Sequence, residues 1–438
     1  MKKISILFLL VLVSVIFVQA QEFPQDGSVY RITNTVRNNA VLVENYLTNE
    51  LNGGDENPLF NDLWKFTKSG EGWNIQNLLT ERYVQIQTSN SKLYRTGETP
   101  AVFYVVRNNS FSKECYNIVN ENGGRWGIHC EKDNDVVPWY SSTENWDGSE
   151  WTYKRIDNIS DEELNAAREK IEQFCDVYNN QERVERIYLS HFEDETCTIL
   201  KSEYQAMSDE ELAASMDSCG DELISVALKI KNNTWAEREK EYRVSTYGPY
   251  SDPDYWGEKL MTHYYSWLNN PTGICATSGD VLYIFVGKEP KQGSTLEIDA
   301  VVNNDSKGKR TELKKGMNII PVSGKDFSFF IIYTADTRKE HVLSDFDSIP
   351  IHIEGGYVNC YWDKMRHNDD DWLDITRNHA KHKYIFVKGE NIMYFMNREL
   401  LISDEICPNT ISDAIGWWDN MIKCRWDAFA WQTCERGT

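Results

Sequence analysis

Val29-Tyr30-Arg31-Ile32-Thr33-Asn34 is the first of three similar stretches, each with an aromatic residue, Ile two positions later and Asn two positions after that. The other two begin at Trp73 and Tyr116, so the aromatic positions 30, 73 and 116 are evenly spaced along the chain. Short alternating segments broken by Asn, Gly and Ser turns follow each opening, which is typical of β-strands. Three such repeats predict a β-trefoil over residues 23–157.

Aromatic residues also close each repeat, and these closing stretches resemble the Gln-x-Trp motif of the ricin B-type lectin domains. The matching places are Asp62-Leu63-Trp64, Val102-Phe103-Tyr104 and Ser149-Glu150-Trp151. The resemblance implies that the Trp, kept twice, is structural and that the module targets glycans. Gln stands at none of the three places, so we expect weak or absent galactose binding. A role as a spacer or protein contact remains the alternative.

The composition restricts the classes of partner. The 438 residues include 46 Lys and Arg against 68 Asp and Glu, a formal net charge of −22 at pH 7. Phosphate contact needs a basic face, so we expect no nucleic-acid partner. Hydrophobic residues make up 41% of the chain, enough to build cores. The length predicts about three domains.

The N-terminus predicts export. Met1-Lys2-Lys3 is basic, Ile4 to Val18 is apolar, and small residues at Val18 and Ala20 suit cleavage, which together indicate a signal peptide over residues 1–20. We expect a secreted, periplasmic or extracellular protein with no integral membrane segment after cleavage. Ten cysteines are compatible with disulfides in that setting. Cys115 with Cys130 is the most plausible local pair, and buried free thiols are the alternative.

The rest of the chain changes character twice. Residues 159–242 predict a helical spacer, because capping boxes at Ser160 and Ser208 precede apolar residues at helical spacing, and Thr234–Tyr242 predicts a further helix. Residues 243–388 alternate between apolar and polar and predict an antiparallel β-sandwich. Residues 389–438 predict helices, above all Thr410–Phe429. The fold class is therefore multidomain and mainly β, with a helical segment.

Four phrases in this second part resemble the enhancin-like zinc metallopeptidases, the M-sixty peptidase family. They are Tyr250-Ser251-Asp252-Pro253-Asp254-Tyr255-Trp256, Asn270-Pro271-Thr272-Gly273-Ile274, Lys315-Gly316-Met317-Asn318 and Ile349-Pro350-Ile351-His352-Ile353-Glu354-Gly355-Gly356. The resemblance implies a β-sandwich beside a helical catalytic domain that hydrolyses glycoproteins such as mucins. It also implies zinc held by His-Glu-x-x-His and a downstream Glu.

That zinc motif is absent from the chain. The eight histidines are His129, His191, His263, His341, His352, His367, His379 and His382. None is followed by Glu and no two are four apart. We interpret the chain as truncated before the family's motif, with residues 389–438 as the incomplete start of the catalytic domain. We therefore expect no catalytic, cofactor-binding or metal-binding residue here, although zinc is expected for the full-length family.

Three histidine patterns favour structural roles over metal binding. His352 and Glu354 lie two apart and face the same side of a predicted strand, where a lone His is more often structural. His379 and His382 have ligand-like spacing on a helix, but their neighbours are basic. His367-Asn368-Asp369-Asp370-Asp371 lacks the Gly and the downstream Glu of a calcium loop and predicts a solvated turn.

Two functional hypotheses follow. In the first, the chain is an exported fragment of an enhancin-like metallopeptidase directed at glycoproteins, with a trefoil that targets glycans. In the second, it is a non-catalytic secreted protein that binds a glycan or glycoprotein. A coding sequence that continues into His-Glu-x-x-His would favour the first hypothesis.

Overall fold

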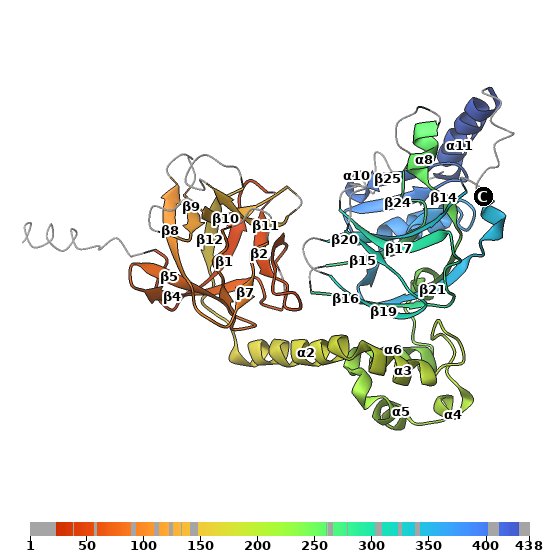
Figure 1. The fold of residues 1–438 in the computed structure, drawn as a ribbon. Helices are drawn as coiled ribbons and strands as arrows, with labels where there is room; N and C mark the ends of the chain where they lie inside the picture. Colours follow the sequence, from red (N-terminus) through yellow and green to blue (C-terminus); the bar gives the residue numbers. More distant parts are fainter. Residues whose placement is uncertain are drawn as a thin grey trace, which may run out of the picture. The chain divides into compact units, whose positions relative to one another are not determined.

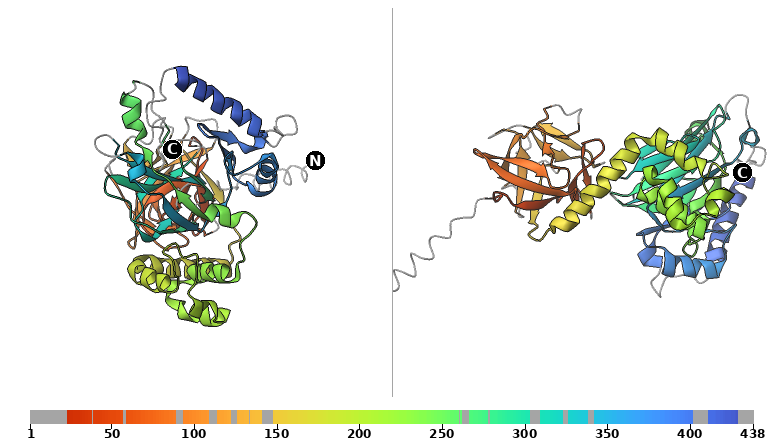
Figure 2. Two further views of the ribbon diagram at one scale, coloured as in Figure 1. Left: turned by 90° about the vertical axis from the view of Figure 1, so that its right-hand side faces the viewer. Right: turned by 90° about the horizontal axis from the view of Figure 1, so that it is seen from below.

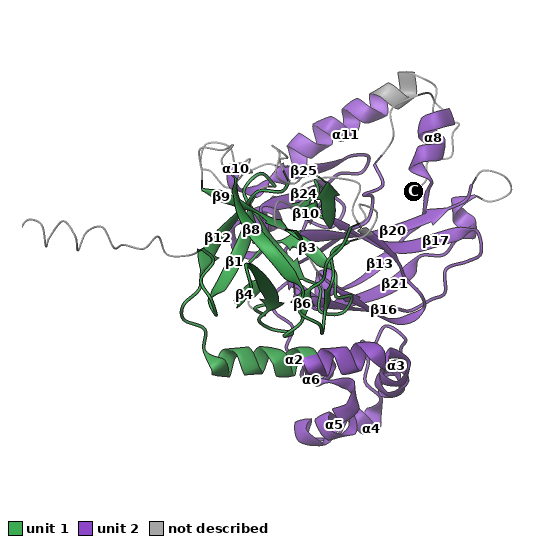
Figure 3. Ribbon diagram, turned by 60° about the vertical axis from the view of Figure 1, so that its left-hand side comes forward, with its two compact units in different colours: residues 1–171 green, residues 172–438 purple. Residues whose placement is uncertain are grey.

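The computed structural model describes residues 23–37, 39–56, 59–88, 93–108, 114–121, 126–132, 134–140, 148–259, 261, 266–277, 279–302, 309–322, 326–337, 342–401 and 411–428. The chain forms two compact units, residues 1–171 and 172–438 (Figure 3). The predicted signal peptide lies outside the described residues. Among the described residues, no helix combines the length and apolar character needed to cross a membrane.

Unit 1 is a single antiparallel sheet of twelve described strands (Figure 1). They are β1 (Val29–Asn34), β2 (Ala40–Glu44), β3 (Leu51–Gly54), β4 (Leu63–Ser69), β5 (Gly72–Asn77), β6 (Tyr83–Val84), β7 (Thr96–Gly97), β8 (Val102–Asn108), β9 (Cys115–Val119), β10 (Trp126–Cys130), β11 (Val136–Tyr140) and β12 (Trp151–Arg155). Strands β1, β4, β5, β8, β9 and β12 pair in a closed ring. The others form the hairpins β2–β3, β6–β7 and β10–β11. Each sequence repeat therefore supplies two ring strands and one hairpin.

The repeated residues have repeated roles inside unit 1. Ile32, Ile75 and Ile118 are all buried in one apolar core. The side-chain oxygen of Asn34 accepts hydrogen bonds from the two backbone N–H groups that follow at positions 36 and 37, and that of Asn77 does the same at positions 79 and 80. The first two repeats thus encode a core residue followed by a side chain that closes a turn, whereas Oδ1 of Asn120 in the third repeat is buried and accepts no hydrogen bond from the described residues.

The predicted Cys115–Cys130 disulfide is not formed in the structure. Both thiols are buried. The Sγ of Cys115 lies 3.9 Å from the backbone oxygen of Asn108, whereas the Sγ of Cys130 lies 3.7 Å from that of Glu131. The two sulfur atoms therefore contact different backbone groups, although their positions in sequence made them a plausible local pair.

Unit 2 is centred on two packed sheets. The first has the order β13-β21-β16-β19 and the second β18-β17-β20-β15-β22, with β14 added parallel to β20. Their strands are β13 (Val244–Tyr247), β14 (Tyr250–Ser251), β15 (Pro271–Ala276), β16 (Val281–Val286), β17 (Ser294–Val301), β18 (Lys309–Glu312), β19 (Gly316–Pro321), β20 (Phe327–Ala335), β21 (Ile349–Glu354) and β22 (Tyr357–Val358). Apolar side chains of both sheets form a shared core that includes Ile284, Ile331 and Ile351.

Helices cover the outer face of the first sheet (Figures 1 and 2). The helices against this face are α3 (Gln181–Ser190), α6 (Asp221–Asn232) and α7 (Glu239–Arg243), and α4 (Ser202–Gln205) and α5 (Asp209–Ser215) connect α3 to α6. The preceding α2 (Asp161–Asn179) begins in unit 1 and ends in unit 2. Tyr188 of α3 stacks on Phe285 of β16 with ring centroids 5.4 Å apart. The predicted helix Thr234–Tyr242 is wrong over most of its length. Asn233 and Arg238 have φ values of 50° and 60°, and these left-handed positions break helical continuity before α7.

A further layer packs on the outer face of the second sheet (Figure 1). It contains β23 (Trp362–Asp363), α9 (Asp369–Asp374), a π-helix (Ile375–His379), β24 (Tyr384–Lys388), β25 (Met393–Asn397), α10 (Arg398–Leu401) and α11 (Ile411–Ala428), while α8 (Pro253–Lys259) follows β14. The prediction of helix throughout 389–438 is wrong for β25. The five residues of β25 pair with β24 in an antiparallel hairpin. This pairing decides their structure, and the helix propensity of the segment alone does not indicate it.

Candidate functional site

Strand β21 places His352 and Glu354 together, within the phrase that carries the metallopeptidase resemblance. Successive side chains of a strand point to opposite faces of the sheet, and here Ile351 and Ile353 point into the core between the two sheets. His352 and Glu354 point to the opposite face, which the helical segment covers, and are 0% and 2% exposed. Their burial follows from the packing of helices on this sheet.

The ring of His352 is hydrogen-bonded on both sides. Its Nδ1 lies 2.8 Å from the backbone oxygen of Thr196, and its Nε2 lies 3.0 Å from Oε1 of Glu354. A backbone carbonyl only accepts hydrogen bonds, so Nδ1 donates to it. Neither nitrogen faces an open position.

The carboxylate of Glu354 is the centre of a buried ion-pair cluster. Its Oε2 lies 2.6 Å from Nζ of Lys229 on α6 and 3.5 Å from Nη1 of Arg243 on α7. Burial, the largest influence, raises the pKa of Glu354, but the hydrogen bond from His352 and the charges of Arg243 and Lys229 outweigh it and lower the pKa below its ordinary value. With both oxygens engaged, this geometry supports a structural role for the His352–Glu354 pair.

The two glycines of the phrase form the turn after β21. Gly355 and Gly356 have φ values of 85° and 53°. A Cβ on Gly355 would lie 1.8 Å from the backbone oxygen of Val281, so only glycine fits there. In this turn, the backbone oxygen of Gly355 accepts a hydrogen bond of 2.9 Å from Nη1 of Arg243. The phrase therefore joins a sheet, a tight turn and a helix.

We predict that His352→Ala leaves the zinc content of the purified protein unchanged. Both ring nitrogens are already engaged by protein groups, so neither is left free to bind a metal. Elemental analysis of wild type and variant, prepared in parallel, measures this. A stoichiometric loss of zinc in the variant alone would show that His352 is a ligand.

His367 and the acidic run after it are also held by protein partners. Nδ1 of His367 accepts from the backbone N–H of Asp363 at 2.9 Å, and Nε2 donates to Glu241 at 2.6 Å. The acidic residues are the first turn of α9, with Asn368 as N-cap in a capping box with Asp371. The prediction of a solvated turn is therefore wrong, because the helix N-terminus favours these carboxylates.

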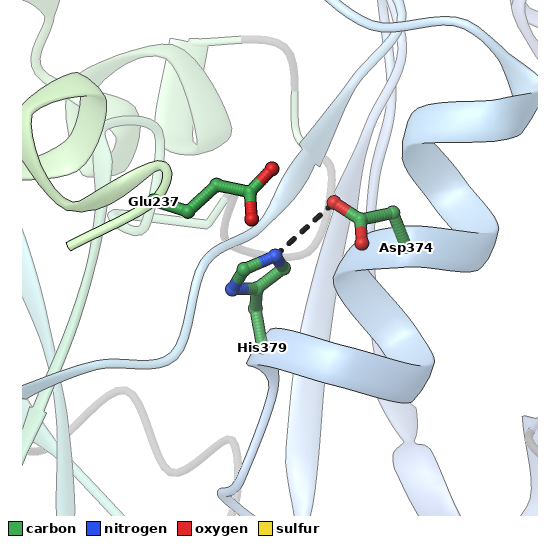
Figure 4. Close-up of side chains that lie close together, drawn as sticks. All are labelled: Glu237, Asp374 and His379. Atoms are coloured by element: carbon green, nitrogen blue, oxygen red, sulfur yellow. Dashed lines mark ion pairs between the residues drawn. The ribbon is translucent and has the colours of Figure 1, made fainter.

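His379 and His382 do not share a helix. His379 is the last residue of the π-helix, whereas the buried His382 lies beyond it, 3.5 Å from Asp326. His379 instead lies 3.1 Å from Asp374, and Glu237 approaches the same point (Figure 4). Asp374 and Glu237 are not among the site residues predicted from the sequence. Only the i, i+5 spacing of Asp374 and His379 could have been a local signal, and Glu237 is too distant in sequence to give one.

In unit 1, the places that resemble Gln-x-Trp are internal. The indole N–H of Trp64 donates to the backbone oxygen of Leu42 at 2.8 Å, and that of Trp151 donates to Ile128 at 2.9 Å. Asp62 and Ser149, at the first and third Gln places, are buried too. Arg31 binds Asp62 at 2.6 Å, and His129 lies 3.0 Å from Ser149. These polar groups already have protein partners, which leaves them poorly suited to hold a sugar hydroxyl.

We predict weak or absent galactose binding by the protein. A sugar site needs placed polar groups beside an aromatic platform. At the first and third closing stretches, these groups are turned inward. Calorimetry of the full chain with galactose and N-acetylgalactosamine measures the binding, with glucose as the control sugar. Micromolar affinity for either galactose-type sugar would contradict the prediction.

Comparison with known proteins gives relatives at the level of structure alone. No family model matches the sequence, and no curated protein matches it. Among solved structures, the chain is similar to a metallopeptidase from Bacteroides thetaiotaomicron, with 28% identity over 58% of this chain and 42% of that one and a TM-score of 0.50. It is also similar to a metallopeptidase in complex with Tn antigen (31% identity, 44% and 36% coverage, TM-score 0.38). A ricin B-like lectin from Macrolepiota procera in complex with lactose matches too (16% identity, 31% and 100% coverage, TM-score 0.28).

The chain spans less than half the length of the two metallopeptidases that it resembles. Over the matched part, this chain has the same fold as the Bacteroides protein, and 28% of the residues are identical. The expected resemblance to metallopeptidases therefore has a structural counterpart, without a family assignment.

Proposed function

We propose that this chain is the recognition part of an exported, glycoprotein-directed protein of the enhancin-like metallopeptidase type, and that it holds no catalytic zinc. The similarity to the metallopeptidase from Bacteroides thetaiotaomicron carries the proposal. The phrase on β21 supports it, because its His, Glu and two glycines each have a defined role in joining the sheet to the helices. Zinc chemistry would belong to a His-Glu-x-x-His motif, which the sequence lacks.

In this proposal, residues 23–157 form a ricin B-like β-trefoil that directs the protein to glycans. The closed ring of six strands and the three hairpins, one per repeat, support a trefoil. The buried Trp64 and Trp151, with matching hydrogen bonds, support structural equivalence of the first and third repeats. The inward-facing residues at the Gln places favour a ligand other than simple galactose.

Binding to a mucin before and after enzymatic removal of its O-glycans tests the proposal. We expect the full chain to bind the intact mucin and to lose binding when the glycans are removed. We also expect the mucin to stay uncleaved, with and without added zinc, when it is examined by electrophoresis. Equal binding to both forms, no binding to either, or cleavage by this chain would each contradict the proposal.

A further inference from the structure

Three ligand-type side chains converge in unit 2, away from the His352–Glu354 pair. They are Glu237, in the turn before α7, Asp374, the last residue of α9, and His379, the last residue of the π-helix (Figure 4). One ligand atom from each lies within 4.8 Å of the other two, and Nε2 of His379 is 3.1 Å from Oδ2 of Asp374. Two donors on one ion at about 2 Å each would be separated by a similar distance.

The π-helix explains why Asp374 and His379 meet. Residues five apart on an α-helix point about 140° away from each other. Here the chain makes a wider turn, in which the backbone N–H of Ala380 donates to the oxygen of Ile375 at 2.8 Å. A π turn brings positions i and i+5 closer to the same side, and such turns are frequent at functional sites.

Two of the three possible metal-ligand groups in this cluster make no hydrogen bond within the described part of the protein. Nε2 of His379 is buried and has no hydrogen-bond partner, because its short approach to Asp374 lacks hydrogen-bond geometry. Glu237 is exposed, and among the described residues its carboxylate takes part in no recorded hydrogen bond or ion pair. A buried ring nitrogen that makes no hydrogen bond costs free energy unless a ligand satisfies it.

The charge balance favours a cation. Arg238 binds Asp374 at 2.7 Å and also pairs with Asp371. Together with Glu237, these are three carboxylates against one guanidinium. Carboxylates therefore outnumber the guanidinium at this cluster, as the binding of a divalent cation requires.

The basic residues that argued against a metal in the sequence lie in solvent. Arg377, Lys381 and Lys383 are all exposed. Charges in water are screened over roughly 8–10 Å. These three basic side chains therefore weaken the attraction of the site for a cation only slightly, and they do not occupy its ligand atoms.

We propose that Glu237, Asp374 and His379 bind a divalent transition-metal ion of the zinc type. One imidazole with two carboxylates suits zinc better than calcium or magnesium, which prefer oxygen-only sites. The exposure of Glu237 leaves the fourth position to water. The ion would join the turn before α7 to α9 and stabilise unit 2 when bound. This site is separate from the zinc motif of the metallopeptidase family and departs from the expectation that the chain holds no metal.

Zinc titration of the tag-free full chain, stripped of metal, tests the proposal by calorimetry and thermal melting. We expect about one zinc ion per chain and a higher melting temperature with zinc. Glu237→Gln and His379→Gln should each weaken binding by at least about tenfold. Glu237 is exposed, so its variant should keep the fold and remains informative if the His379 variant does not. Glu258→Gln, at another exposed position of unit 2, is the control and should bind as wild type does.

Zinc retained equally in all variants would mean an adventitious ion only and would overturn the proposal. An absence of zinc binding to the wild type would overturn it as well. Tighter binding of calcium than of zinc would contradict the ligand chemistry on which it rests. Loss of zinc from both ligand variants, with retention in Glu258→Gln, supports it.

Discussion

Glu354→Ala is expected to lower the free energy of unfolding of unit 2 by about 3–5 kcal/mol. The substitution removes the carboxylate that Arg243, Lys229 and His352 share. Arg243 is only 6% exposed, so its charge would stay buried with less compensation. Breaking such a cluster from one side is costly, because the desolvated partners remain.

Peptide-resolved hydrogen exchange in rising urea measures this loss for each unit separately. A single two-state transition is not expected for a chain of two units. Glu289→Ala is the matched control, since Glu289 is an exposed residue of the same unit, and it should change stability by less than about 0.5 kcal/mol. A loss below about 1 kcal/mol for Glu354→Ala would show that the cluster contributes little.

The same carboxylate makes the stability of unit 2 sensitive to acid. The pKa of Glu354 in the folded protein lies below the ordinary value of 4.5. Its contribution is therefore fully present above about pH 4.5 and is lost as the pH falls through the lowered folded-state value. Glu354→Gln cannot take up this proton, so its stability should fall less steeply below about pH 4.5 than that of the wild type. Equal slopes would contradict the assigned role.

The sequence predicted those features that are encoded locally. Asn34 and Asn77 close their own turns, so the first two repeats show this part of their structure within a few residues. The helix predicted over Thr410–Phe429 is present as α11 for a similar reason. Its apolar stripe has helical spacing, and Ile411 and Ile415 are buried.

The features that escaped prediction depend on residues far apart in sequence. Glu354 contacts Lys229, and His379 lies beside Glu237, across more than a hundred residues in each case. No periodicity links such pairs. The strand β25 was missed because its short, mainly apolar sequence is compatible with helix or strand, and its partner β24 decides between them.

Trp64→Ala is expected to lower the free energy of unfolding of unit 1 by about 3–5 kcal/mol. Trp64 is fully buried in the core of the ring, and its indole N–H binds the backbone oxygen of Leu42 in β2. The substitution would leave a large cavity and an unpaired carbonyl. Trp151→Ala should cost a similar amount, because Trp151 makes the equivalent bond to Ile128 in β10.

Two further variants separate the causes. Trp64→Phe keeps most of the packing but loses the N–H donor, so we expect a smaller loss of about 1–3 kcal/mol. Ile86→Ala removes an apolar side chain that is 45% exposed and should change stability by less than about 0.5 kcal/mol. The same hydrogen-exchange experiment measures all four variants in unit 1. If Trp64→Ala were costly and Trp151→Ala were not, the two closing stretches would not be structural equivalents, and the threefold repeat would lose its main energetic support.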